Sequence, residues 1–182
     1  MTHPVLAMPR LRFGLLSRRL VLAGLAGLAA APAGAGEAEL LRGVEGDHPA
    51  GYYRRAADLL REGRRDEAVF VFYVGQLRYR THLAARPDLP RDRDAALFAS
   101  LSEVVGRPVN EYAFGDIPAL DRTLKAVMAY DAAHPDTFTP PARYPQATRS
   151  IREGLELFRQ KLVTEADQIR AMRTRNGLPN RN

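Results

Sequence analysis

The fold depends on one stretch of the chain, "DEAVFVFYVGQLRYRTH", which runs from Asp66 to His82. Its apolar run from Val69 to Val74 is rich in β-branched and aromatic residues, and this content alone favours a strand. Two acidic residues lead the stretch, however, as is favourable at the start of a helix. Apolar and small residues then recur at helical spacing: Ala68, Phe72, Gly75, Tyr79 and Leu83. Since a strand of this length would be unusual, the stretch predicts a buried helix that ends before Pro87.

The remaining chain predicts further helices and no strand. Periodic apolar residues indicate helices over 49–63, 95–105, 116–134 and 151–176. Gly63 is expected to end the first of them in a left-handed conformation, and Asp116 to cap the start of the third. The short helix over 95–105 is expected to place Leu97, Leu101 and Val104 on its buried side. The predicted fold class is therefore all-α, with about five helices.

The ends of this helical region have their own signals. Residues 37–49, "EAELLRGVEGDHP", are predicted to form a leader or a loose first turn. The last helix is expected to be long, because an apolar seam with steps of four and three continues to Met172, interrupted by Glu165. Gly177 then supplies the turn that ends this helix, with Leu178 as its apolar contact.

The two helices around Gly63 resemble one tetratricopeptide unit. The residues that carry the resemblance are Tyr52, Ala56, Leu59, Gly63, Ala68, Phe72 and Gly75. In that family, small residues let two antiparallel helices approach closely while large residues fill the space between them. Arg80 stands where the family usually has a proline, and no second copy follows at a spacing of 34 residues. The resemblance implies a single helical hairpin and a concave face that binds peptides.

The N-terminal 35 residues predict an export signal. Four arginines and no acidic residue precede an apolar run from Leu20 to Ala31, and Ala33-Gly34-Ala35 fits the small-x-small rule for a cleavage site near Ala35. "SRRLVL", from Ser17 to Leu22, resembles the twin-arginine export motif, although an ordinary export signal can also contain adjacent arginines. The sequence thus predicts a periplasmic protein with an export signal over 1–35 and one helical domain over 36–182.

Composition excludes several classes of function. The chain has 27 Lys+Arg and 21 Asp+Glu, and without the four arginines of the signal the mature part carries a net charge of only +2. A basic stripe for nucleic acid is therefore not expected. The chain has no cysteine, which excludes disulfides, a thiol nucleophile and a lipid anchor at cysteine. With the signal removed, no segment is expected to span a membrane.

The sequence contains no diagnostic catalytic motif. The histidines of the mature part, His48, His82 and His134, lack metal-ligand spacing to one another or to a carboxylate, so capping or surface roles are expected and no metal or cofactor is predicted. Glu103 and Glu111 flank the segment "VVGRPVN" and could serve as the paired carboxylates of a muramidase-like glycoside hydrolase. A structural ion pair, with Arg107 or Arg78, is the alternative interpretation of the same charges.

One polar stripe on the central helix is the main candidate for function. Tyr73, Gln76 and Arg80 lie at i, i+3 and i+7, on a helix whose other sides are apolar. They either brace the segment "GRPVNEYAFGD", where the partners would be Asn110, Glu111 and Asp116, or line a groove that binds a partner. We expect an exported binding or adaptor protein with a protein or peptide partner, and a cell-wall hydrolase that uses Glu103 and Glu111 as the alternative.

Overall fold

The computed structural model describes residues 33–182, and this part of the chain is helical and contains no strand. The α-helices are α1 (Ala33–Leu41), α2 (Ala50–Arg61), α3 (Arg65–Ala85), α4 (Ala96–Leu101), α5 (Arg107–Ala113), α6 (Ile117–Ala133), α7 (Pro145–Thr164) and α8 (Ala166–Arg175). Two π-helical turns, Arg91–Ala95 and Ser102–Gly106, flank α4. The predicted all-α class is confirmed. The export signal expected over 1–35 lies outside the described residues except for its last three positions.

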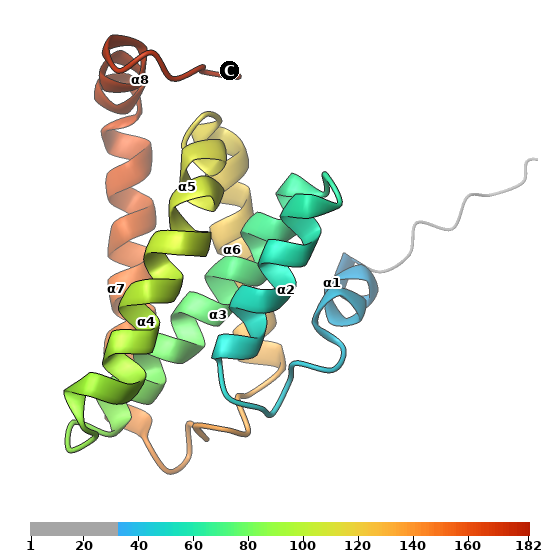
Figure 1. The fold of residues 1–182 in the computed structure, drawn as a ribbon, viewed down its shortest axis with the longest axis vertical. Coiled ribbons are helices and arrows are strands. Elements are labelled where there is room, and N and C mark those ends of the chain that lie inside the picture. Colours follow the sequence, from blue (N-terminus) through green and yellow to red (C-terminus); the bar gives the residue numbers. More distant parts are fainter. Residues whose placement is uncertain (1–32) are drawn as a thin grey trace, which may run out of the picture. The chain divides into compact units, whose positions relative to one another are not determined.

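The stretch from Asp66 to His82 forms the middle of α3, as predicted. Asp66 and Glu67 lie in the first turn of α3, and the helix ends at Ala85. Its apolar residues are buried on nearly all sides, because α1, α2, α5, α6 and α7 all pack against it. Figure 1 shows α3 in the centre of the molecule with the other helices around it. A helix enclosed in this way has no need of a polar face, which explains the unbroken apolar run.

The α2–α3 pair is the closest packing in the fold. Tyr52, Ala56 and Leu59 of α2 are buried, and a short turn with Gly63 at φ +78° connects the two helices. The amide of Gly63 donates to the carbonyl of Leu60, and the amide of Arg64 donates to that of Leu59, which is the hydrogen-bond pattern of a Schellman cap. A Cβ on Gly75 would lie 2.4 Å from the Cβ of Tyr52, so only glycine permits this approach.

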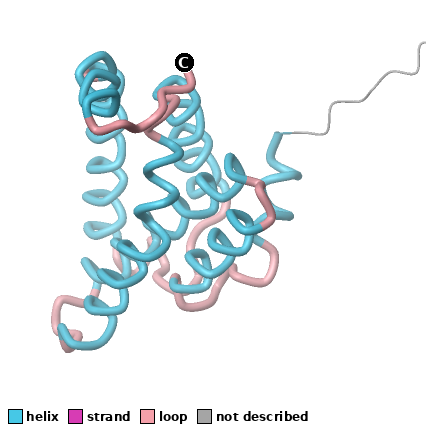
Figure 2. Tube along the Cα trace, turned by 45° about the horizontal axis from the view of Figure 1, so that its top comes forward, coloured by secondary structure: helices cyan, strands magenta, loops and turns pink. Residues whose placement is uncertain are grey.

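The layout of about five helices is wrong. The segment "NEYAFGD", which lies between the predicted helices over 95–105 and 116–134, belongs largely to α5, whose N-terminal turn accommodates Pro108. The chain before α2 is not a loose turn either, since α1 buries Leu41 completely. The long C-terminal helix is divided at Glu165 into α7 and α8. Figure 2 shows these additional helical segments and the short loops between them.

The face assigned to the 95–105 helix is also wrong. Leu97 is 42% exposed and Val104 is 70% exposed, whereas Val105 and Val109 are buried. The π-helical turns explain the difference, because each adds a residue to a turn and rotates the following side chains around the helix axis. A pattern that assumes a uniform α-helical period therefore assigns the wrong face here.

The start of α6 follows the prediction. The Asp116 carboxylate accepts a 2.9 Å hydrogen bond from the amide of Ala119 and so caps α6. The residues that recur along this helix at steps of three and four are all buried: Ile117, Leu120, Leu124, Val127 and Asp131. Within residues 33–182, no helix combines the length and the hydropathy that crossing a bilayer requires.

Candidate functional site

The polar stripe of α3 forms the floor of a cavity. Tyr73 is buried, Gln76 is half-buried and Arg80 is exposed, so the stripe runs from the core out to solvent. Leu77, which is also buried, lies on the same side of the helix. All four side chains line one cavity of about 430 Å³. This volume lies within the range of roughly 300–1,000 Å³ that is usual for ligand sites.

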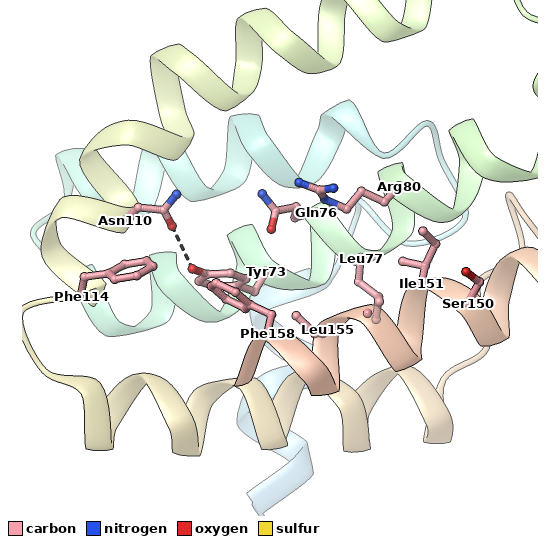
Figure 3. Close-up of a pocket in the computed structure, with 11 residues that line it drawn as sticks. Tyr73, Gln76, Leu77, Arg80, Asn110, Phe114, Ser150, Ile151, Leu155 and Phe158 are labelled. Carbon is pink, nitrogen blue, oxygen red and sulfur yellow. Dashed lines mark hydrogen bonds between the residues drawn. The ribbon is translucent and has the colours of Figure 1, made fainter. Parts of the chain in front are cut away.

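Two other helices form the walls of this cavity, which we call the α3 groove. Asn110 of α5 and Phe114, which directly follows α5, lie on one side. The wall on the α7 side is made of Ser150, Ile151, Gly154, Leu155 and Phe158. Figure 3 shows Phe114 at one end of the groove and Ser150 at the other, with the α3 side chains between them. The groove therefore has apolar walls with polar groups from three helices.

Tyr73 connects α3 to α5. Its hydroxyl donates a 2.9 Å hydrogen bond to Oδ1 of Asn110, as Figure 3 shows. Burial raises the pKa of the Tyr73 phenol, so the hydroxyl keeps its proton and acts as a donor. The ring of Phe158 lies 6.4 Å from the Tyr73 ring, centroid to centroid. Tyr73 is thus held in place by groups on both walls.

Gln76 and Arg80 do not brace the neighbouring segment. Their side chains make no hydrogen bond or ion pair with any residue of the described chain. The Arg80 guanidinium lies 5.4 Å from the centroid of the Phe98 ring, a cation–π contact at an exposed position. Both polar heads are consequently available to a molecule in the groove.

Of the residues expected to brace the "GRPVNEYAFGD" segment, only Asn110 pairs with the α3 stripe. Asp116 caps its own helix instead, and Glu111 is exposed and lines a different cavity with Tyr112. A loop at this position would need side-chain partners for its backbone groups. Because most of it is helical, its backbone groups are satisfied within α5.

The paired carboxylates of the hydrolase interpretation are both exposed side chains. Glu103 is exposed and forms an i,i+4 ion pair with Arg107, one of the two structural partners considered from the sequence. The other, Arg78, pairs with Asp131 instead. Neither Glu103 nor Glu111 has the apolar surroundings that keep a glycosidase acid protonated.

His134 is exposed, as expected, but His82 is buried and His48 is half-buried. His82 is only 3% exposed, and it lies with His48 and Asp94 in a cluster whose potential ligand atoms are all within 4.8 Å of one another. His48 does have a capping role, since its Nδ1 accepts from the amide of Ala50 at the start of α2. No local spacing could reveal the cluster, because the loop after α3 and the segment before α2 bring its members together.

The hydrogen bonds of His82 favour a proton over a metal in this cluster. Nη1 of Arg86 lies 2.7 Å from Nδ1 of His82, and a guanidinium can only donate, so Nδ1 accepts. The ring proton is then on Nε2, which donates to Asp94 over 2.7 Å. A metal ligand normally uses its second ring nitrogen as a donor. In His82 the second ring nitrogen, Nδ1, accepts a hydrogen bond from the positively charged Arg86 instead of donating one. This arrangement does not fit a metal ligand.

Comparisons with known proteins give no assignment of function. No family model matches the chain, and no solved structure matches it. A protein of Haemophilus influenzae, described as an uncharacterized protein, is 36% identical over 110 residues. That alignment covers 57% of this chain and 42% of the relative, so the match spans less than half of the relative's length.

Proposed function

We propose that this protein is a binding or adaptor module whose α3 groove holds a segment of a protein or peptide partner. The observation that carries the proposal is the position of Gln76 and Arg80. Both lie on the floor of an apolar-walled cavity and have no polar partner within the described chain. Polar groups that orient a ligand between apolar walls are characteristic of binding sites between helices.

The composition of the groove indicates the chemistry of the partner. Leu77, Leu155 and Phe158 provide an apolar surface for one or two large side chains. Gln76 can both donate to and accept from a peptide group, and Arg80 can bind a carboxylate at the exposed end. The partner segment therefore combines an apolar anchor with an acidic group.

Two further observations support the proposal, one on the location of the protein and one on the kind of partner. The N-terminal 35 residues have the charge and the cleavage pattern of an export signal with a twin-arginine-like motif, so we place the protein in the periplasm. In the tight α2–α3 hairpin Gly75 lies against Tyr52, and this contact of a small with a large residue supports the proposed resemblance to a tetratricopeptide unit. Peptide binding is the usual role of that family.

The hydrolase alternative has less support. A glycosidase requires two carboxyl groups across one cleft, and the general acid needs an environment that raises its pKa. Glu103 is instead paired with Arg107 on the surface, and Glu111 lines a cavity on another side of α5. Digestion of purified peptidoglycan by the wild-type protein tests this alternative. If the wild type digests peptidoglycan and the Glu103→Gln variant does not, the hydrolase alternative is favoured over peptide binding in the α3 groove.

The first test compares cavity variants with a matched surface control. Peptides selected from a displayed library on the wild-type protein should bind Arg80→Ala at least about tenfold more weakly, as expected when a charge-assisted hydrogen bond is lost. They should also bind Gln76→Ala more weakly, by a smaller factor, because its hydrogen bonds to a peptide group are neutral. Arg122→Ala, an exposed arginine on α6 outside the cavity, should bind like the wild type. Melting temperatures of all three variants should match the wild type, since none of these side chains is buried.

A second test fills the groove. Gly154 lies on the α7 wall, and a Cβ at this position would meet no atom within 4 Å. Gly154→Leu should therefore project into open space, abolish peptide binding and leave the fold intact or slightly more stable, because glycine is a poor helix former. Gly154→Ala is the matched control and should bind better than Gly154→Leu. Equal binding by the leucine variant and the wild type would exclude the groove as the binding site.

A further inference from the structure

The C-terminal tail folds back against the end of α5. The amide of Arg181 donates to the carbonyl of Gly115 at 2.7 Å, and its Nη2 donates to the carbonyl of Tyr112 at 3.0 Å. The Arg181 guanidinium lies over the Tyr112 ring, 3.5 Å from the ring centroid. These contacts place a cation beside the last turn of α5, on residues that do not line the α3 groove.

A second arginine is buried in the same region. Arg173 of α8 is 6% exposed, and its Nη2 donates to the carbonyl of Pro179 at 2.8 Å. Its Nε has no hydrogen-bond partner, and no carboxylate of residues 33–182 forms an ion pair with it. A buried guanidinium normally has hydrogen-bond acceptors for its N–H groups and a negatively charged partner, because burying an uncompensated charge is costly.

The two guanidinium groups converge on Gly115. A Cβ built on this glycine would lie 3.1 Å from Nε of Arg181 and 3.2 Å from Nη2 of Arg173. Both guanidinium groups therefore lie near the same point, and neighbouring like charges repel unless an anion lies between or beside them. The carbonyls at the C-terminal end of α5 offset part of this repulsion, but each is neutral.

A third arginine completes the cluster. Arg65, at the start of α3, lies 5.6 Å from the centroid of the same Tyr112 ring, on which Arg181 is also placed. All three arginines line one cavity of about 380 Å³. Glu111 is the one acidic residue among its lining side chains, and it makes no ion pair with any of them. The cavity therefore has three cations and one exposed carboxylate.

We propose that this cavity binds an oxyanion, a phosphate or carboxylate group, through Arg65, Arg173 and Arg181. The planar guanidinium presents paired N–H donors that match the oxygens of such groups, and two or three converging arginines bind them far better than one. Tyr112 holds two of the arginines by its ring face. The bound anion supplies the missing negative partner of Arg173 and removes the repulsion around Gly115.

The test titrates the full chain with inorganic phosphate and, separately, with acetate, each at constant ionic strength maintained with sodium chloride. The Nε–H resonance of Arg173 is followed by NMR. We expect a saturable shift with at least one of the two anions, and the stronger of the two identifies the class of oxyanion. The same anion should raise the melting temperature of the protein, because it binds the folded state.

Variants of the exposed arginines separate this site from a purely structural clamp. Arg65→Gln and Arg181→Gln should weaken anion binding at least about tenfold. Arg175→Gln, an exposed arginine of the same α8 that does not line the cavity, should leave binding unchanged. Both variants change exposed side chains, so a loss of anion binding does not arise from unfolding, as it could in a variant of the buried Arg173. The absence of a saturable shift with either anion, or equal binding by all variants, would overturn the proposal and leave the arginines as a tail clamp.

Discussion

Nε of Arg78 lies 3.4 Å from a carboxylate oxygen of Asp131, and both side chains are almost completely buried between α3 and α6. The same guanidinium donates to the hydroxyl of Tyr52 and, at 2.7 Å, to the carbonyl of His134. Asp131 also accepts a 2.8 Å hydrogen bond from Arg152 of α7. One buried carboxylate therefore joins three helices.

We expect Asp131→Asn to destabilise the protein by about 3–5 kcal/mol, because it removes the carboxylate that is paired with the buried Arg78 charge. Urea denaturation followed by circular dichroism measures the change. Asp58→Asn is the control. Asp58 pairs with Arg61 at the surface, so its loss should cost no more than about 1 kcal/mol. A similar small loss for Asp131→Asn would show that the pair adds little to stability.

Two glycines on buried and open helix faces should respond in opposite directions to alanine. Gly75→Ala places a Cβ 2.4 Å from the Cβ of Tyr52, and the resulting separation of α2 from α3 should cost about 1–3 kcal/mol. Gly154→Ala meets no atom within 4 Å and should stabilise the protein by up to about 1 kcal/mol through helix propensity. Thermal melts of both variants check this. A neutral Gly75→Ala would mean that α2 and α3 can separate without loss.

The fold could be predicted from the sequence wherever apolar residues repeat along one face of a regular α-helix. Local spacing and backbone conformation predicted the buried Tyr52, Ala56 and Leu59 of α2 and the glycine turn at Gly63. They did not predict Tyr53 of α2 and Tyr130 of α6, which are also buried. The apolar run of α3 was correctly predicted as helical because its length excludes a strand. Tyr73, Gln76 and Arg80 were grouped for the same reason, since i, i+3 and i+7 share one helix face.

Prediction from the sequence failed in two situations. In one the backbone departs from the regular α-helical period, and in the other residues that are distant in sequence come together in the fold. Leu97 and Val104 are exposed beside the two π-helical turns that flank α4. The apolar spacing of the sequence does not predict such turns. His48, His82 and Asp94 meet only in the folded chain. The buried position of Arg173 was also unforeseen, because a basic residue in the last turn of a helix is ordinarily exposed.

The His82 cluster should make the fold sensitive to acid. Burial, together with the nearby positive charge of Arg86 and the ring of His48, lowers the pKa of His82 in spite of its hydrogen bond to Asp94. The hydrogen bond from His82 also lowers the pKa of Asp94. The unfolded chain consequently binds more protons than the folded chain as the pH falls.

The resulting stability is present above the ordinary pKa of histidine, about 6.5, and is lost as the pH falls through the lower pKa of the folded state. Unfolding free energies measured between neutral and acid pH should decrease accordingly. In His82→Gln the amide can still donate to Asp94 and accept from Arg86 but cannot titrate, so the decrease in this range should be smaller. An unchanged pH profile in the variant would exclude His82 as its source.

The last prediction separates the role of Tyr73 from the role of the other stripe residues. Because the Tyr73 hydroxyl is already bonded to Asn110, Tyr73→Phe should cost about 0.5–1.5 kcal/mol of stability, the usual net value of a neutral hydrogen bond. In a double-mutant cycle with Asn110→Ala, the two losses should not add, because each variant removes the same bond. Peptide binding to the α3 groove should be reduced much less by Tyr73→Phe than by Arg80→Ala, whose guanidinium is exposed at the groove. Additive losses in the cycle, together with a tenfold or larger loss of binding in Tyr73→Phe, would instead make the Tyr73 hydroxyl a direct contact of the partner.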